Sequence, residues 1–146
     1  AADLRIVVFV PNFPMLTSEA RDILPRHVSR ADAVFNVSRA SLLIAAMATG
    51  SIGHLRMAME DALHQPYRRK LFPAMDEIIE ASVEAGAAGA ALSGAGSSIL
   101  AFTLGGEDRV AEAMTQAGAR TGVEGRTIVT RVCYTGAQIV DKSWGD

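Results

Sequence analysis

The stretch Leu92-Ser93-Gly94-Ala95-Gly96-Ser97-Ser98 decides the fold, because it places two glycines and three serines between a small-residue run and an apolar run. No side chain after Leu92 is larger than serine, so the stretch adds little packing mass. Glycine reaches backbone angles that are closed to other residues, which favours a tight turn with uncovered amides. Consecutive amides of this kind form a concave surface that binds anions. A plain hairpin turn between two core strands has the same composition, and the turn alone does not separate the two interpretations.

The composition is that of one soluble α/β or α+β domain. The 146 residues suffice for a single core, 49% of them are hydrophobic, and 5% are aromatic. The net charge of −2 provides no bulk attraction to nucleic acid or to a membrane surface. The single cysteine, Cys133, excludes an internal disulfide and fits a reducing compartment, so we expect a cytoplasmic protein. The longest strictly apolar run, residues 42–48, is far shorter than a membrane span.

The chain starts almost directly with a strand. Residues 4–10 form a short apolar, β-branched run that Pro11 closes, which is typical of a buried strand. The chain has no initiator methionine, and its start lacks the basic and apolar segments of a signal peptide. We therefore expect residues 1–146 to be a single domain from the middle or end of a longer protein.

Two helix signals follow the first strand. Thr17 suits the N-cap of a short helix, which carries Arg21 on the same side and stops before Pro25. Ser29, with Asp32 three residues later, has the spacing of a capping box at the start of a longer helix. The sequence therefore predicts a short helix and then a long one.

The long helix should end at Gly50, which suits a left-handed cap. Its residues 34–47 are apolar on nearly all sides, so we expect this helix to lie beneath other elements. Ser51 should start a further helix that continues to Pro66, with Glu60-Asp61 on its exposed side. The segment between the first strand and the glycine-rich turn is thus expected to be mainly helical.

The remaining pattern predicts an α+β fold. We expect a helix with Pro73 at its first position and Gly86 at its end, followed by two strands near 88–92 and 98–104. A second helix should run from Glu107-Asp108 to Gly118. The last expected element is a strand over 127–134 with a continuation through 137–140. This order matches a split βαβ, or ferredoxin-like, sandwich with extra helices after the first strand. We therefore expect a four-stranded antiparallel sheet with helices on one face.

Three clusters have residue types that suit anion binding. They are Thr17 with Arg21, the basic segment 67–70 around Arg68, and the turn at 93–98. Arginine recognises carboxylate and phosphate through two parallel hydrogen bonds, although an isolated arginine is commonly a solvated surface charge. The three histidines lack the spacing of metal ligands, and we assign neither a metal site nor a catalytic residue. The residues alone predict an anion-binding α+β domain.

Three segments resemble conserved motifs of the GHMP small-molecule kinases. Residues 91–102, ALSGAGSSILAF, are similar to the family's third motif, S-G-S/A-G-P-T/S followed by apolar residues, with Ser97 where proline is usual. Residues 17–25, TSEARDILP, resemble the T-x-E-A-R-x-x-L-P segment of the homoserine kinase branch. Residues 61–73 resemble its D-x-x-x-E/Q-P-Y-R-x-x-L-x-P segment. The three matches occur in the family's order and belong to its C-terminal half.

The resemblance implies an ATP-dependent kinase that converts L-homoserine to O-phospho-L-homoserine in threonine biosynthesis. Catalysis would rest on positioning and on charge stabilisation, with Mg²⁺ neutralising the phosphates. The family's glycine-rich phosphate loop, which would bind most of the ATP and Mg²⁺, is absent from this chain. Its partner would then be its own N-terminal domain, and the chain alone would be inactive. A homodimer is compatible with the family, and no nucleic acid or membrane partner is implied.

The motifs also imply roles for individual residues. Arg21 and Arg68 would bind the substrate carboxylate, and Thr17 would lie near the reacting end of the substrate. The residues that would support the phosphate loop and the nucleotide side of the cleft are Ser93, Gly94, Ala95, Gly96, Ser97 and Ser98. Two alternatives stay open: a GHMP kinase that acts on mevalonate, galactose or a shikimate-type substrate, and a non-catalytic amino-acid-binding regulatory domain.

Overall fold

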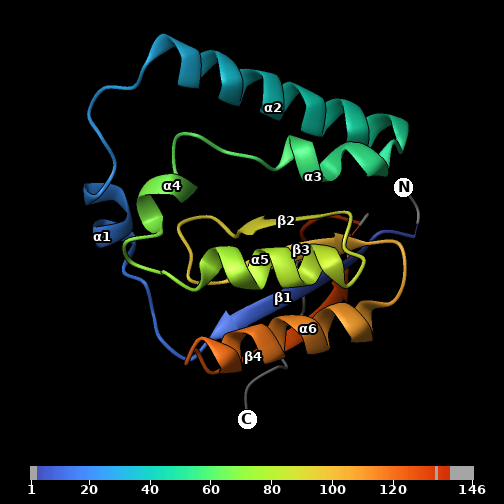
Figure 1. The fold of residues 1–146 in the computed structure, drawn as a ribbon. Coiled ribbons are helices and arrows are strands. Elements are labelled where there is room, and N and C mark those ends of the chain that lie inside the picture. The colour runs from blue at the N-terminus through green and yellow to red at the C-terminus, as the bar shows by residue number, and fades with distance from the viewer. Residues whose placement is uncertain (1–2, 134, 139–146) are drawn as a thin grey trace.

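The computed structural model describes residues 3–133 and 135–138 (Figure 1). One four-stranded antiparallel sheet has the order β2-β3-β1-β4. The strands are β1 (Arg5–Pro11), β2 (Gly89–Leu92), β3 (Ile99–Thr103) and β4 (Gly125–Arg131). This is the strand order of a split βαβ sandwich, so the predicted α+β class is confirmed. The strand predicted over 127–134 spans Gly125–Arg131, and its expected continuation is wrong at residues 137–138, which are in no strand. Tyr134 and positions 139–140 lie outside the described residues.

The helices occupy two separate regions of the chain. Between β1 and β2 lie α1 (Thr17–Asp22), α2 (Arg30–Thr49), η1 (Ile52–His54), α3 (Leu55–Ala58), α4 (Gln65–Arg68) and α5 (Met75–Glu84), and between β3 and β4 lies α6 (Glu107–Arg120). Three predicted ends differ by one or two residues: Leu16 rather than Thr17 is the N-cap of α1, α5 begins after Pro73, and α6 continues past Gly118. Such shifts are expected, because side-chain preferences define helix ends only loosely.

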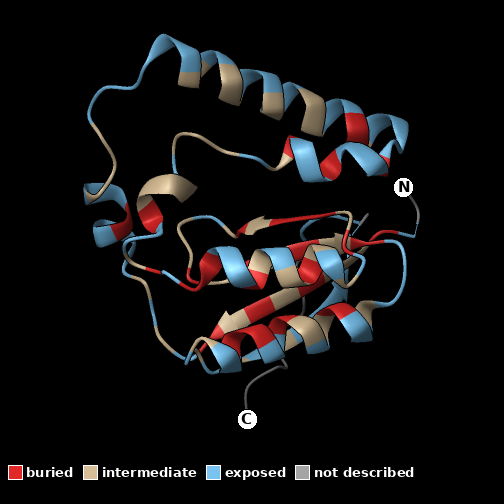
Figure 2. Ribbon diagram, viewed as in Figure 1, coloured by how far each residue is buried: buried red, intermediate tan, exposed pale blue. Residues whose placement is uncertain are grey.

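The main core lies between one face of the sheet and helices α5 and α6 (Figure 2). Val7 and Phe9 on the central strand are fully buried, and their neighbours Ile6 and Val8 point to the other face and are only partly buried. Ile78 of α5 and Met114 of α6 complete this core. The alternation along β1 therefore follows from the two-residue period of a strand.

A second group of helices covers part of the opposite sheet face. Gly89 and Phe102 are paired across β2 and β3 and therefore share a face. A Cβ atom added to Gly89 would lie 2.8 Å from the backbone carbon of Leu55, so α3 lies directly on this face. Phe102 packs against a smaller core that includes Leu4 and Leu55. The expectation of helices on one face is wrong, because the apolar residues of the second face also need cover.

Helix α2 lies on the outside of this second group, and its predicted burial beneath other elements is wrong. Val34, Val37 and Ile44 are 60%, 68% and 70% exposed, whereas Ala46 is buried against α3 and its neighbours. The predicted caps are confirmed: Ser29 Oγ accepts a hydrogen bond from the Asp32 amide, and Gly50 is left-handed. By length and mean hydropathy α2 is also able to span a membrane, a test that core helices of soluble proteins pass as well.

The helix predicted from Ser51 to Pro66 is broken in the structure. Helix α3 ends at Ala58, and α4 starts only at Gln65, with Pro66 in its single turn. Between the two helices the Asp61 carboxylate binds backbone amides, which competes with helical hydrogen bonding. The prediction that Glu60-Asp61 lies on the exposed face of a helix is therefore wrong, because both residues lie in a loop and Asp61 is partly buried.

Candidate functional site

Arg68 joins two of the three predicted clusters, although its own position is nearly sealed from solvent. Helix α4 carries this arginine, and only 7% of its surface is exposed. Its Nε donates to the carbonyl oxygen of Ala20 in α1 at 3.3 Å. Its Nη1 donates to the carbonyl oxygen of Gly94 in the glycine-rich turn at 2.9 Å. One side chain thus connects the Thr17–Arg21 helix with the turn at 93–98.

Some hydrogen-bond donors of the Arg68 guanidinium have no partner among the described residues. An arginine has five N–H donors, and Nη2 of Arg68 donates to none of the described residues. In the described part of the chain, no side-chain nitrogen or oxygen is both fully buried and unpaired, so Nη2 is not fully buried. The side chain lines a cavity of about 610 Å³. Arg68 therefore places a positive charge at the wall of this cavity, and its Nη2 has no hydrogen-bond partner among the described residues.

The cavity has an apolar floor and one polar wall. The second face of the sheet forms the floor through Ala91, Leu100 and Phe102, and helix α2 contributes Leu43. The polar groups all come from the α3–α4 segment and the turn: Asp61, His64, Gln65, Arg68 and Gly94. A volume of this size is typical of a small-molecule site, and convergent polar groups on one side orient a bound molecule.

The turn at 93–98 is both a hairpin and a donor surface. Its ends are closed by a hydrogen bond of 2.8 Å from the amide of Ser93 to the carbonyl oxygen of Ser98. Gly94 and Gly96 both have positive φ angles, of 60° and 94°, which explains the need for glycine. The amides of Gly94, Ala95 and Ser97 donate to no described residue. The hairpin interpretation is therefore confirmed, and the open amides are compatible with the predicted anion-binding surface, which stays a prediction.

The loop before α1 holds the turn in place. Ser97 Oγ donates to the carbonyl oxygen of Phe13 at 2.8 Å, and the residue is 8% exposed. A Cβ atom at Gly96 would lie 3.0 Å from Cε of Met15, so this contact is close. Phe13 in turn packs edge-on against Phe72, with ring centroids 5.2 Å apart. The serine at the position where proline is usual in the family therefore ties the turn to the loop through its hydroxyl.

Thr17 and Arg21 lie on α1 and are both exposed. Neither lines the cavity beside Arg68, and Arg21 forms no ion pair with a described residue. Ala20 between them is fully buried and accepts the hydrogen bond of Arg68. The structure thus brings helix α1 to Arg68, but it leaves the two predicted side chains at the surface.

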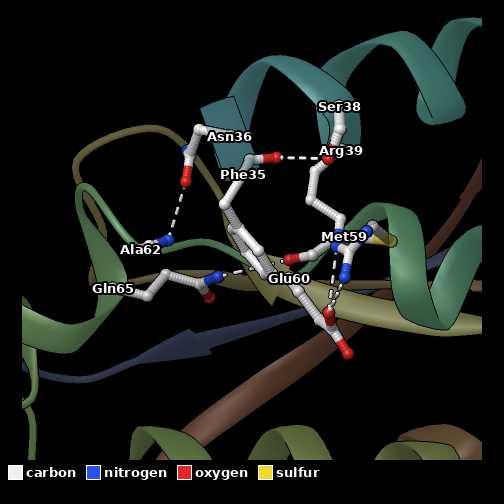
Figure 3. A network of polar contacts seen from close by, with 8 residues as sticks. All are labelled: Phe35, Asn36, Ser38, Arg39, Met59, Glu60, Ala62 and Gln65. Atoms are coloured by element: carbon white, nitrogen blue, oxygen red, sulfur yellow. Dashed lines mark hydrogen bonds and ion pairs between the residues drawn. The ribbon is translucent and has the colours of Figure 1, made fainter. Parts of the chain in front are cut away.

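Sequence reasoning missed three residues beside the site. Gln65 of α4 accepts a hydrogen bond from the amide of Leu92, which directly precedes the turn, at 3.1 Å. Asp61 accepts four hydrogen bonds, one of them from Asn36 of α2. Figure 3 shows neighbouring contacts, among them the hydrogen bond from the amide of Ala62 to Asn36. Burial acts to raise the pKa of the Asp61 carboxyl, but these bonds outweigh it and hold the pKa below its ordinary value. One sequence signal could have identified Asp61: aspartate is a common capping residue, and this one lies shortly before the helix start at Gln65-Pro66.

The fold and the site define a split βαβ domain in which a buried arginine and an open glycine-rich turn meet beside a cavity. The profile of the family described as GHMP kinases C terminal matches residues 43–120. The chain belongs to this family, as its motifs indicated.

Similar proteins within this family are homoserine kinases. The homoserine kinase of Persephonella marina is 38% identical over 137 residues, which are 94% of this chain and 46% of the relative. That of Caldicellulosiruptor bescii is 52% identical over 101 residues, 69% of this chain and 33% of the relative. The crystal structure of homoserine kinase from Cytophaga hutchinsonii has a TM-score of 0.85 at 26% identity, covering 90% of this chain and 42% of that one. The chain spans less than half of these relatives and matches the C-terminal portion of homoserine kinases.

Proposed function

We propose that this chain is the substrate-binding C-terminal half of a cytoplasmic homoserine kinase, which transfers phosphate from ATP to the hydroxyl of L-homoserine in threonine biosynthesis. The observation that carries the proposal is Arg68, which lines the cavity and whose hydrogen bonds join α1 and the turn while Nη2 donates to no described residue. The relatives that match over most of this chain are named homoserine kinases.

The proposed roles follow from the chemistry of each group. The free donors of Arg68, with Arg21, bind the substrate carboxylate in the planar geometry that a guanidinium favours. Thr17 lies near the reacting end of the substrate. The open amides of Gly94, Ala95 and Ser97 suit negatively charged oxygens, so the turn supports the phosphate loop and the nucleotide side of the cleft.

ATP and Mg²⁺ are proposed to bind mainly to the N-terminal half of the protein. Within the described residues no group of three His, Cys, Asp or Glu side chains could hold a metal ion. The open amides of the turn suit phosphate oxygens, which is the contribution to nucleotide binding proposed for this chain. When bound, Mg²⁺ would neutralise phosphate charge during transfer, and this half would supply orientation of the acceptor alcohol.

Substituting Arg21 tests the proposed carboxylate site. In the full-length protein, Arg21→Ala should raise the KM for homoserine roughly 10-fold to 100-fold, because a charge-assisted pair contributes about 1.5–3 kcal/mol. Steady-state kinetics with both substrates should find the KM for ATP nearly unchanged. The matched control is Arg30→Ala, another exposed arginine at the start of α2, outside the motifs. An unchanged homoserine KM in Arg21→Ala would contradict the assignment.

The remaining alternatives predict different substrates or no reaction. Assays of the full-length protein with homoserine, mevalonate, galactose and shikimate separate the kinase alternatives from one another. Preferential phosphorylation of one of the other alcohols would replace the proposal with that activity. Binding of an amino acid without any phosphate transfer would favour a regulatory domain.

A further inference from the structure

The Asp61 carboxylate is fully occupied by hydrogen bonds. Its Oδ1 accepts from Asn36 Nδ2 at 2.6 Å and from the amide of Leu63 at 3.0 Å. Its Oδ2 accepts from the amides of His64 at 2.7 Å and Gln65 at 2.5 Å. A carboxylate offers about four acceptor positions, and these four donors use them. Asp61 lines the cavity, yet it has no acceptor left for a substrate amine or for proton transfer.

These bonds hold the start of α4. A helix of a single turn is not stable by itself, and the N-cap residue His64 provides no side-chain cap. Asp61 supplies the missing acceptors instead, through three successive backbone amides. Arg68 stands at the last position of the same turn, three residues after Gln65. A displacement of the start of α4 therefore displaces the guanidinium.

Asn36 connects this arrangement to α2. Its Nδ2 donates to Asp61, and its Oδ1 accepts from the amide of Ala62 at 2.8 Å, so one side chain binds the loop twice. A neighbouring contact binds the same loop without touching Asp61. Arg39 pairs with Glu60 at 2.9 Å and lies over the ring of Phe35 (Figure 3). Both Asn36 and Arg39 attach α2 to this loop, but only Asn36 binds Asp61. Replacing each residue in turn therefore distinguishes a role of the Asn36–Asp61 bond from the general attachment of α2 to the loop.

We propose that Asp61 and Asn36 are positioning residues of the kinase reaction: they hold α4 so that the free Nη2 of Arg68 faces the carboxylate of the substrate. This inference rests on the proposed function. It adds a chain of contacts that runs from α2 through Asn36 and Asp61 to Arg68, the arginine proposed to bind the substrate. Neither residue touches substrate in this arrangement, because their polar atoms are used within the loop.

Kinetics of two variants in the full-length protein test this chain of contacts. Asp61→Ala and Asn36→Ala should each raise the homoserine KM roughly tenfold or more, because small misplacements of a binding group are costly. The KM for ATP and kcat should change far less. The control Arg39→Ala removes the neighbouring contact and should leave the homoserine KM within about twofold. Asn36→Ala keeps the amide bonds of Asp61, so it remains usable if Asp61→Ala does not fold.

A double-mutant cycle tests whether the rise in homoserine KM that Asn36→Ala causes depends on Arg68. On an Arg68→Ala background, Asn36→Ala should add little to the homoserine KM, since the group that it positions is gone. Independent, multiplicative effects, or an unchanged KM in both single variants, would overturn the inference while leaving the proposed function intact. Failure of the wild-type protein to phosphorylate homoserine would overturn the proposed function, and this inference with it.

Discussion

At the scale of single residues, Arg68 carries the most information about function. Burying an arginine is costly unless its donors are paired. Arg68 is paired with two carbonyl oxygens, which satisfy donors without neutralising the charge. Its guanidinium forms no ion pair with the described residues. A buried positive charge with unpaired donors suits an anionic ligand, which is the role proposed for Arg68, and a carboxylate matches the geometry of a guanidinium.

The stability of the protein should depend on the ionisation of Asp61. Hydrogen bonds from Asn36 and three amides outweigh burial and lower the pKa of this carboxyl below its ordinary value of 3.8. A lowered folded-state pKa adds stability that is present above the ordinary pKa and is lost as the pH falls through the folded value. Asp61→Asn replaces one acceptor oxygen by an NH2 group, so it should be less stable than wild type by about 1 kcal/mol at neutral pH, and the difference should shrink in acid.

Urea unfolding over a series of pH values measures this difference. Asp22→Asn is the matched control, because Asp22 is exposed and its carboxylate has no hydrogen bond with a described residue. That variant should follow the wild-type profile. A stability loss in Asp61→Asn that stays constant into acid would show that the charge of Asp61 is not involved.

At the scale of elements, the short helices α3 and α4 depend on their neighbours. Each has a single turn, and a single turn gains too little from its own hydrogen bonds to persist. Asp61 stabilises α4 from its start, and close contact with Gly89 of β2 fixes α3 on the sheet. The periodicity of residues 51–65 predicted one long helix, because a sequence pattern does not show that a side chain such as Asp61 will take the amides.

Adding a methyl group at Gly89 should separate α3 from the sheet. The Cβ atom of Gly89→Ala would lie 2.8 Å from the backbone carbon of Leu55, and backbone cannot turn aside as a side chain does. We expect a loss of about 1–3 kcal/mol in unfolding free energy. Gly53→Ala is the control, since a Cβ atom there meets nothing within 4 Å. Equal stability of the two variants in thermal or urea unfolding would show that the close packing of α3 on β2 is unimportant.

At the scale of the whole molecule, this chain has its own core and sheet but only one side of the proposed reaction. One core of buried residues lies between the sheet and helices α5 and α6, and the Arg68 cavity lies against the other face. The relatives that it matches are more than twice its length. Under the proposed function, most of the groups that bind ATP belong to the part of those relatives that this chain does not cover.

The chain of 146 residues alone should therefore show no measurable kinase turnover. The expected result is no ATP-dependent formation of phosphohomoserine by the purified chain, while the full-length protein is active in the same assay. Circular dichroism should show that the isolated chain retains helix and sheet, so that inactivity is not a consequence of unfolding. Clear turnover by the isolated chain would contradict the division of labour between the two halves.

The sequence by itself determined the α+β class, the positions of the four strands, the caps at Ser29 and Gly50, and the three kinase motifs. These features depend on preferences that act within a few residues. Only the tertiary structure decided that α2 lies outside, that helices cover both sheet faces, and that Arg68 joins α1 to the turn. The partners of Arg68 are 48 and 26 residues away in the chain, and such a contact arises only when distant segments pack together.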